Sequence, residues 1–367
     1  MPAPLPGAID CDVHIAVPQT RTLVPFLDEY WADHVRLRGV DTQSYQMSSL
    51  PPRAPLSVRP DWQASDGALP GSQYADLKAK VLDHFQLKFA LCHCIHGTQI
   101  MLSEDMSLAF CKATNDWLAR EWLDRDPRLR ASIVVPAESA ELAAEEIERV
   151  AADERFVQVL MLAMGERPLG RRSYWPIYGA AERHKLPIGI HAGSNYRHAP
   201  TSIGWPSYYL EDYVVQAQAF AAQLLSLVTE GVFVKFPELK VVMMESGVTW
   251  LPGMIWRADK TWRGVRFEVP WLHQAPGEII RSHIRFTIQP FDAPPRREQL
   301  ERLLEQLGSE DILLFSTDYP HWHFDGDDAV PDGLPDALVR KMLFDNPLMT
   351  CPRLSQAAAR DSQEQAP

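Results

Sequence analysis

Eight short apolar runs alternate with longer, more polar stretches along almost the whole chain. The runs cover residues 8–14, 88–95, 130–135, 157–163, 187–192, 240–245, 283–287 and 311–318. Several intervening segments show helical periodicity, most clearly 137–154, and also 174–185, 211–233 and 297–308. Short buried strands that alternate with helices are typical of a parallel sheet. Eight of them within 367 residues predict one α/β domain, a (β/α)8 TIM barrel.

Two segments do not fit this alternation. Residues 36–71 are rich in Pro, Ser and Arg and have weak periodicity, so we expect an insertion after the first strand that forms a cap or an interface arm. Residues 357–367 are polar and rich in Gln and Ala, which predicts a flexible tail. The whole chain, 1–367, is therefore expected to be a single barrel domain.

Charge and cysteine content limit the classes of function. The net charge is −12, from 36 basic and 48 acidic residues, and there are no basic runs, which argues against nucleic-acid or anionic-membrane partners. No apolar run reaches membrane-spanning length, and the N-terminus does not resemble a signal peptide. The five cysteines include no zinc-type CxxC pair. We therefore expect a cytoplasmic enzyme with reduced thiols.

Several of the predicted strands end in residues of the types that can bind metals. The first ends with Asp12 and His14, the fifth with His191, the sixth with Glu245, and the eighth with Asp318, after which the chain runs on to His321. Each residue taken singly is more often a turn former, a helix cap or a hydrogen-bonded core residue. Catalytic groups of such barrels, however, lie together at the carboxyl ends of the strands. Their joint occurrence there predicts a metal site.

Spacing and burial support this interpretation. Asp12 and His14 are two residues apart and project to the same face of a strand. Glu245 follows an apolar run directly, where a bare carboxylate is costly to bury and a cation offsets that cost. Carboxylate and imidazole ligands without thiolate suit Fe or Mn and also allow Zn, so the ligand types alone leave the metal open.

The motifs "IDCDVH", "LPIGIHAG", "ESGVTWLP" and "LLFSTDYPHWHFD" carry a resemblance to a known family. From about residue 8 to 354 the chain resembles the amidohydrolase-related metal-dependent TIM barrels, the group that contains aminocarboxymuconate-semialdehyde decarboxylase. The family's usual HxH pair on strand 1 is DxH here, and its usual catalytic histidine on strand 6 is Glu245. His14, His191 and Asp318 match the broad family pattern.

The two departures resemble a subgroup, the TIM-barrel nonheme diiron monooxygenases, whose pattern Asp12 and Glu245 match. This resemblance implies that six residues hold two metals, with His321 as a ligand or a substrate contact: Asp12, His14, His191, Glu245, Asp318 and His321. It implies a dinuclear iron site, or iron with another metal, that uses O₂ to hydroxylate a small or acyl substrate. Glu245 and His321 are then the expected catalytic residues.

Two alternatives stay open. A mononuclear Zn or Mn hydrolase or nonoxidative decarboxylase would use Glu245 as a general base. A catalytically silent paralogue would support a homologous subunit, since a homologous partner or a homo-oligomer fits a segment rich in tryptophan. Lesser candidates for orienting ligands or contacting substrate are Asp10, His93, His96, His323, Gln289, Tyr208, Tyr209 and the arginines at 167, 171 and 172.

Overall fold

The computed structural model describes residues 3–41, 58–64, 66–96, 101–194, 198–321 and 328–364. These residues form one parallel sheet of eight strands, in which each strand pairs with its sequence neighbour. The strands are β1 (Ile9–His14), β2 (Phe89–His93), β3 (Leu129–Val134), β4 (Phe156–Met164), β5 (Ile188–Ser194), β6 (Val241–Met244), β7 (Ile284–Thr287) and β8 (Leu313–Leu314). Each lies in or overlaps a predicted run, and the predicted (β/α)8 barrel is confirmed.

The barrel closes where the segment after β8 runs beside β1. The Cys11 amide donates to the carbonyl oxygen of Phe315 at 2.9 Å, and the His14 amide donates to that of Tyr319 at 2.7 Å. The Asp318 amide donates back to the carbonyl oxygen of Asp12 at 3.0 Å. These main-chain bonds bring the carboxyl ends of the first and last strands together.

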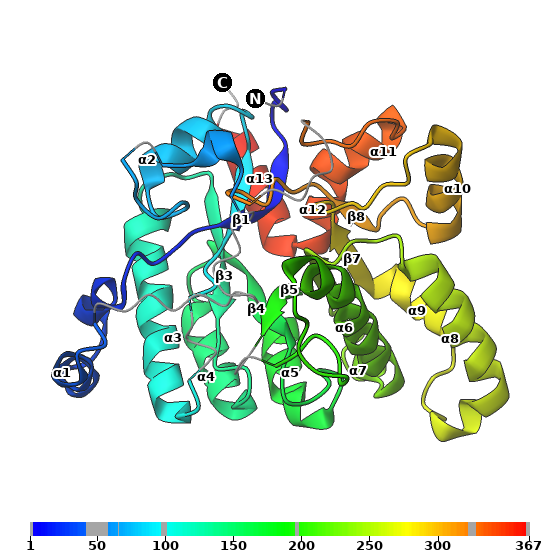
Figure 1. The fold of residues 1–367 in the computed structure, drawn as a ribbon, viewed down its shortest axis with the longest axis horizontal. Helices are drawn as coiled ribbons and strands as arrows, with labels where there is room; N and C mark the ends of the chain where they lie inside the picture. Colours follow the sequence, from blue (N-terminus) through cyan, green and yellow to red (C-terminus); the bar gives the residue numbers. More distant parts are fainter. Residues whose placement is uncertain are drawn as a thin grey trace.

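Helices cover the outside of the barrel and follow one another in sequence order, from blue through green to red (Figure 1). They are α1 (Glu29–Arg38), α2 (Tyr74–Leu77), α3 (Glu104–Leu118), α4 (Ala140–Val150), α5 (Trp175–Arg183), α6 (Tyr209–Thr229), α7 (Val232–Lys235), α8 (Leu251–Val265), α9 (Pro276–His283), α10 (Arg297–Leu307), α11 (Asp336–Arg340), α12 (Asn346–Thr350) and α13 (Pro352–Glu364). In α4, the buried residues Ala143, Ile147 and Val150 recur at helical spacing. None of the described helices is both long and apolar enough to cross a bilayer.

The floor of the barrel, where the strands pack against the C-terminal helix, is apolar. A buried cluster there joins the strands to α13: Ile9, Cys11, Phe89, Leu91, Val157, Leu160, Val242, Met244, Leu314, Cys351, Leu354 and Ala357. The Arg353 guanidinium donates to the carbonyl oxygens of Ala151 at 3.0 Å and Phe156 at 2.9 Å. These contacts anchor the start of α13, and the helix continues to Glu364, into the predicted tail at 357–367. The flexibility of this tail stays a prediction.

Part of the predicted insertion at 36–71, around Arg59 and Trp62, lies next to the segment after β8. The Trp62 ring packs on Tyr319 with a centroid distance of 5.3 Å. The Arg59 amide donates to the carbonyl oxygen of Pro320 at 2.9 Å. Residues 42–57 and 65 lie outside the described residues. The interpretation of this insertion as a cap or interface arm stays a prediction.

Candidate metal centre

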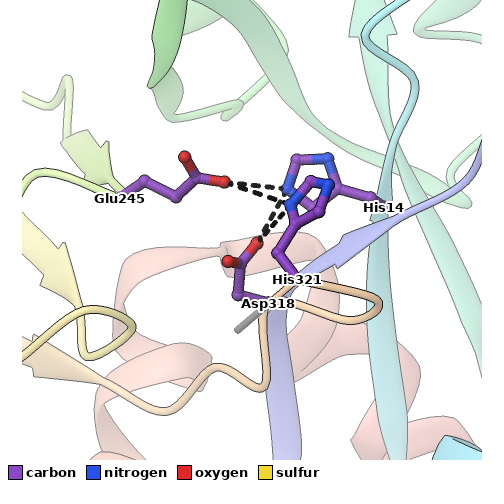
Figure 2. Close-up of side chains that lie close together, drawn as sticks. All are labelled: His14, Glu245, Asp318 and His321. Carbon is purple, nitrogen blue, oxygen red and sulfur yellow. Dashed lines mark hydrogen bonds and ion pairs between the residues drawn. The ribbon is translucent and has the colours of Figure 1, made fainter. Parts of the chain in front are cut away.

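The structure brings all six predicted site residues together at the mouth of the barrel. Asp12 and His14 lie on β1, His191 lies on β5, and Glu245 directly follows β6. Asp318 and His321 come from the segment after β8. Figure 2 shows His14, Glu245, Asp318 and His321 pointing toward one another from different parts of the chain.

His14 is at the centre of this cluster. Its Nε2 lies 2.9 Å from Asp318 Oδ1, 3.2 Å from Glu245 Oε1 and 3.1 Å from His191 Nε2. Asp12 Oδ1 lies 3.6 Å from the same nitrogen. Donor atoms of four other side chains therefore lie within 3.6 Å of one imidazole nitrogen.

His321 completes the cluster on the side of Glu245. Its Nδ1 lies 3.3 Å from Asp318 Oδ1 and 3.6 Å from Glu245 Oε1. Two overlapping groups have donor atoms within 4.8 Å of one another, one of His14, Glu245, Asp318 and His321 and the other of Asp12, His14 and His191. Because both groups share His14, and one imidazole nitrogen has one lone pair to offer, the arrangement fits a single ion best.

Two of the carboxylates are presented by strained backbone. Glu245 has φ 57° and Asp318 has φ 54°, in the left-handed region that non-glycine residues rarely adopt. Such residues cost about 1–3 kcal/mol each and persist where the surrounding structure fixes them. The Glu245 amide donates to Thr287 Oγ1 at 3.3 Å, and the Asp318 amide bonds the carbonyl of Asp12. Both turns aim a carboxylate at the mouth immediately after a strand.

The charges of the cluster call for a cation. Asp12 is fully buried, and neither of its carboxylate oxygens has a hydrogen-bond partner among the described residues. Burial, followed by the charges of Asp318 and Glu245, raises the pKa of Asp12 well above its usual range. A divalent ion in contact with Asp12 would remove both difficulties, so the residues present fit a metal.

His191 and His321 have pKa values shifted in opposite directions. Burial lowers the pKa of His191 to about 4, and its Nδ1 lies 2.7 Å from the carbonyl oxygen of Ala192. The ring is therefore neutral, and its Nε2 lone pair faces the cluster, as a metal ligand requires. Burial also lowers the pKa of His321, but Asp318 and Glu245 outweigh it and raise that pKa to about 10. A protonated His321 thus balances part of the negative charge.

Asp10 lies between two parts of the chain that carry predicted ligands, and its orienting role stays a prediction. Its carboxylate accepts hydrogen bonds from the Asp12 amide at 3.2 Å and from Thr317 Oγ1 at 2.6 Å. It thereby ties β1 to the segment that carries Asp318. Burial lowers the pKa of His96 to about 4, and this ring belongs to neither group of clustered ligand atoms. His323 lies outside the described residues.

A tyrosine pair on α6 was only partly anticipated. Tyr208 is 70% exposed, whereas Tyr209 is partly buried and stacks on Tyr213 with a centroid distance of 5.6 Å. Burial, with smaller contributions from the charges of Glu245 and Asp318, raises the pKa of Tyr209 to about 12. The four-residue spacing of the two tyrosines is the signal that could have identified Tyr213.

The three arginines after β4 already have partners. Arg167 lies 3.5 Å from a Glu138 carboxylate oxygen, and Arg171 lies 3.3 Å from that of Glu230. The Arg172 guanidinium lies over the Trp175 ring at 5.2 Å. These contacts favour a structural role for the arginines. The backbone N–H of Gln289 donates to Ser316 Oγ at 3.1 Å.

Comparison with known proteins gives a consistent set of relatives. Residues 9–349 match the family model described as Amidohydrolase. The chain is 26% identical over 277 residues to gamma-resorcylate decarboxylase of Rhodococcus jostii, covering 70% of this chain and 83% of the relative. It is 24% identical over 283 residues to the enzyme of the same name from a Rhizobium species, and this match covers 72% of this chain and 85% of the relative.

Solved structures show the same fold. The 2,6-dihydroxybenzoate decarboxylase from Rhizobium matches with a TM-score of 0.67 and 19% identity, covering 94% of this chain and 98% of that chain. A 5-carboxyvanillate decarboxylase variant from Novosphingobium aromaticivorans, with bound manganese, matches with a TM-score of 0.66 and 18% identity, covering 94% and 97%.

These relatives correct the predicted reaction. The monooxygenase hypothesis, with its iron and oxidoreductase chemistry, is wrong, because the curated and solved relatives above are named decarboxylases. Nothing found supports a dinuclear iron site, O₂ or a partner subunit. The physical reason for the error is that carboxylate and imidazole donors are shared by iron oxygenases and by Mn or Zn enzymes. The departures at Asp12 and Glu245 therefore did not determine the chemistry.

Proposed function

Because the chain belongs to the amidohydrolase family, we propose that it is a metal-dependent nonoxidative decarboxylase of an aromatic hydroxy acid. The relatives named above carry the names of gamma-resorcylate, 2,6-dihydroxybenzoate and 5-carboxyvanillate decarboxylases. The observation that carries the proposal is the convergence of buried carboxylate and imidazole donors around His14 Nε2.

The proposed metal ligands are Asp12, His14, His191 and Asp318, with Mn²⁺ as the first choice and Zn²⁺ as the alternative. The orphaned oxygens of Asp12 and the neutral ring of His191 support this set. When bound, a divalent ion acts as a Lewis acid that orients and polarises anionic oxygens of the substrate.

The remaining pair, Glu245 and His321, supplies the proton chemistry. Decarboxylation breaks the bond between the ring carbon and the carboxylate carbon, and CO₂ leaves while the electron pair stays on the ring. One proton must then reach that ring carbon. Glu245 Oε1 lies 3.6 Å from His321 Nδ1. Burial and the charge of Asp318 raise the pKa of Glu245, but His191, His14 and His321 outweigh them and lower it to about 2. We therefore assign His321 as the source of the proton, and Glu245 as the carboxylate that takes it up and passes it to the ring carbon.

An aromatic substrate suits the surroundings of this pair. Tyr209 and Tyr213 stack with an interplanar angle of 21°, and the charges of Glu245 and Asp318 act on both. Their rings offer an apolar, polarisable surface close to the proton donor. We propose that this tyrosine pair packs against the substrate ring.

The test is the decarboxylation of 2,6-dihydroxybenzoate and of 5-carboxyvanillate by the Mn²⁺-loaded protein, with and without O₂. We expect one CO₂ per decarboxylated product and equal rates in the two atmospheres. A hydroxylated product that requires O₂ would contradict the proposal. No CO₂ from either acid, together with hydrolysis of an amide or ester substrate in a separate assay, would favour the hydrolase alternative.

A Glu245→Gln variant separates proton delivery from metal binding. The amide keeps the shape of the side chain but cannot deliver the proton, so we expect retained Mn²⁺ and lost turnover. An Asp318→Asn variant is the matched control, because Asp318 is assigned as a ligand and should lose Mn²⁺ as well. Loss of the metal from Glu245→Gln would reassign Glu245 as a ligand.

A further inference from the structure

A buried polar chain crosses the barrel interior between the apolar floor and the cluster at the mouth. Gln158 Nε2 on β4 lies 3.1 Å from Ser132 Oγ on β3. That hydroxyl lies 2.9 Å from His93 Nδ1 on β2. His93 Nε2 lies 3.0 Å from the carbonyl oxygen of Cys11 on β1. All three polar side chains are at most 1% exposed.

The partners fix the direction of every hydrogen bond in this chain. A carbonyl oxygen only accepts, so His93 Nε2 must carry the proton that it donates to Cys11. His93 Nδ1 then accepts from the Ser132 hydroxyl, whose oxygen in turn accepts from the Gln158 amide. One tautomer of His93 is therefore imposed by its neighbours.

The barrel makes room for this chain. A Cβ atom at Gly189 on β5 would lie 2.3 Å from Gln158 Nε2, so a larger residue there would displace the amide. Gln158 Nε2 also lies 3.5 Å from Met244 Sδ, at the residue that precedes Glu245. The polar chain thus reaches from the strand that presents Glu245 to the strand that presents Asp12.

This series of hydrogen bonds ends at His93, next to the Asp12 carboxylate, whose oxygens have no hydrogen-bond partner among the described residues. His93 Nε2 lies 3.7 Å from Asp12 Oδ1, too far for a hydrogen bond, and it holds the Cys11 carbonyl of the same peptide unit. The Asp12 amide is held by Asp10, and the Asp12 carbonyl by Asp318. The main chain of Asp12 is therefore fixed on every side, while its carboxylate oxygens are left available for an ion.

We propose that His93, Ser132 and Gln158 are positioning residues that hold the Asp12 carboxylate in place for the metal. This inference rests on the metal site of the proposed function and extends it to residues that do not touch the ion or the substrate. Removing the Ser132 hydroxyl deprives His93 Nδ1 of its donor. The ring is then free to change tautomer or rotate, and the Cys11–Asp12 peptide loses its anchor.

The test is the dissociation constant of Mn²⁺ measured by electron paramagnetic resonance, without substrate. Residues that support metal ligands typically change metal affinity by about 10- to 100-fold. We expect Ser132→Ala to weaken Mn²⁺ binding about tenfold and to broaden the spectrum of the bound ion. Gln158→Met, which keeps the side-chain volume and removes the donor, should show a smaller loss in the same direction.

Thr114→Val is the matched control. Thr114 is also fully buried, and its hydroxyl has no hydrogen-bond partner among the described residues. It lies on α3, outside the polar chain, so its variant should bind Mn²⁺ like the wild type. Circular dichroism of the metal-free variants checks that each is folded.

The outcomes separate this inference from the proposed function. Wild-type Mn²⁺ affinity in folded Ser132→Ala and Gln158→Met would overturn the positioning role. Equal weakening in Thr114→Val would overturn it too, since the effect would then follow from any buried hydroxyl. Weakened Mn²⁺ binding in Ser132→Ala and Gln158→Met would support the inference whatever the reaction is. A wild type that binds Mn²⁺ but releases no CO₂ would overturn the proposed function alone.

Discussion

The floor and the mouth of the barrel are built from the same strands but have opposite chemistry. On β1, Ile9 joins the apolar floor, whereas His14, five residues later, stands in the cluster at the mouth. The floor has apolar side chains packed on α13. The mouth has buried carboxylates and two residues with positive φ. The floor therefore stabilises the fold, and the mouth gives up stability to hold reactive groups in place.

Changing Asp318 should produce the largest effect at the mouth. Removal of one group that stabilises developing charge costs about 10²–10³ in turnover, and Asp318→Ala also removes a proposed ligand, so we expect a loss of about 1,000-fold. The metal-free protein should be no less stable, because one of several repelling carboxylates is gone. Steady-state rates and urea unfolding of the metal-free variant check both parts. A marked loss of stability would show that Asp318 supports the fold.

Changing Leu354 should have the opposite effect. Leu354 is fully buried on α13 within the floor cluster. Leu354→Ala should lower the free energy of unfolding by about 2–5 kcal/mol, because it removes buried methyl groups and leaves a cavity. Turnover per folded molecule should stay within about twofold of wild type, and urea unfolding with activity assays at low temperature measures both. Lost turnover in the folded variant would show that floor and mouth are coupled.

Metal binding should raise the free energy of unfolding, and this increase should depend on the ligands at the mouth and not on the floor. At a free Mn²⁺ concentration of 100 times its dissociation constant, the free energy of unfolding should rise by about 2.7 kcal/mol. Leu354→Ala should keep this increment and Asp318→Ala should lose it. Thermal unfolding at several Mn²⁺ concentrations measures the effect. An equal increment in Asp318→Ala would place the ion elsewhere.

The smallest predicted effect compares strain in the two regions. Lys185 is exposed, lies in the turn before β5 and has φ 57°, the same value as Glu245. Lys185→Gly should raise the free energy of unfolding by about 0.5–1 kcal/mol without changing turnover, because glycine adopts this conformation freely. Glu245→Gly relieves the same strain but should abolish turnover. Destabilisation by Lys185→Gly would mean that its backbone is not strained.

The sequence was sufficient for the fold because the strand signal is local. All eight apolar runs became strands, and the barrel rule then placed their carboxyl ends at one mouth. That rule is also why Asp12, His191 and Asp318, far apart in the chain, were expected to meet. The helix that runs into the predicted tail at 357–367 was not anticipated, because it begins beside Arg353, whose partners lie about 200 residues away.

The roles of single residues and the reaction were harder to predict. His93 on β2 has no distinctive spacing, and its place beside Asp12 follows only from the pairing of the strands. Tyr213 could not be linked to the site from the sequence, because the link depends on where α6 lies relative to the mouth. The choice of a monooxygenase failed because the same ligand types serve several metals and reactions. The assignment of the six residues to metal binding and catalysis remains a prediction.

The most direct test of the account is the metal content of the protein after reconstitution with excess Mn²⁺ and removal of free ions. Elemental analysis should find one Mn²⁺ per chain, and Asp318→Ala should retain none. A wild-type protein with no bound ion, or with two ions per chain, would contradict a single metal centre around His14.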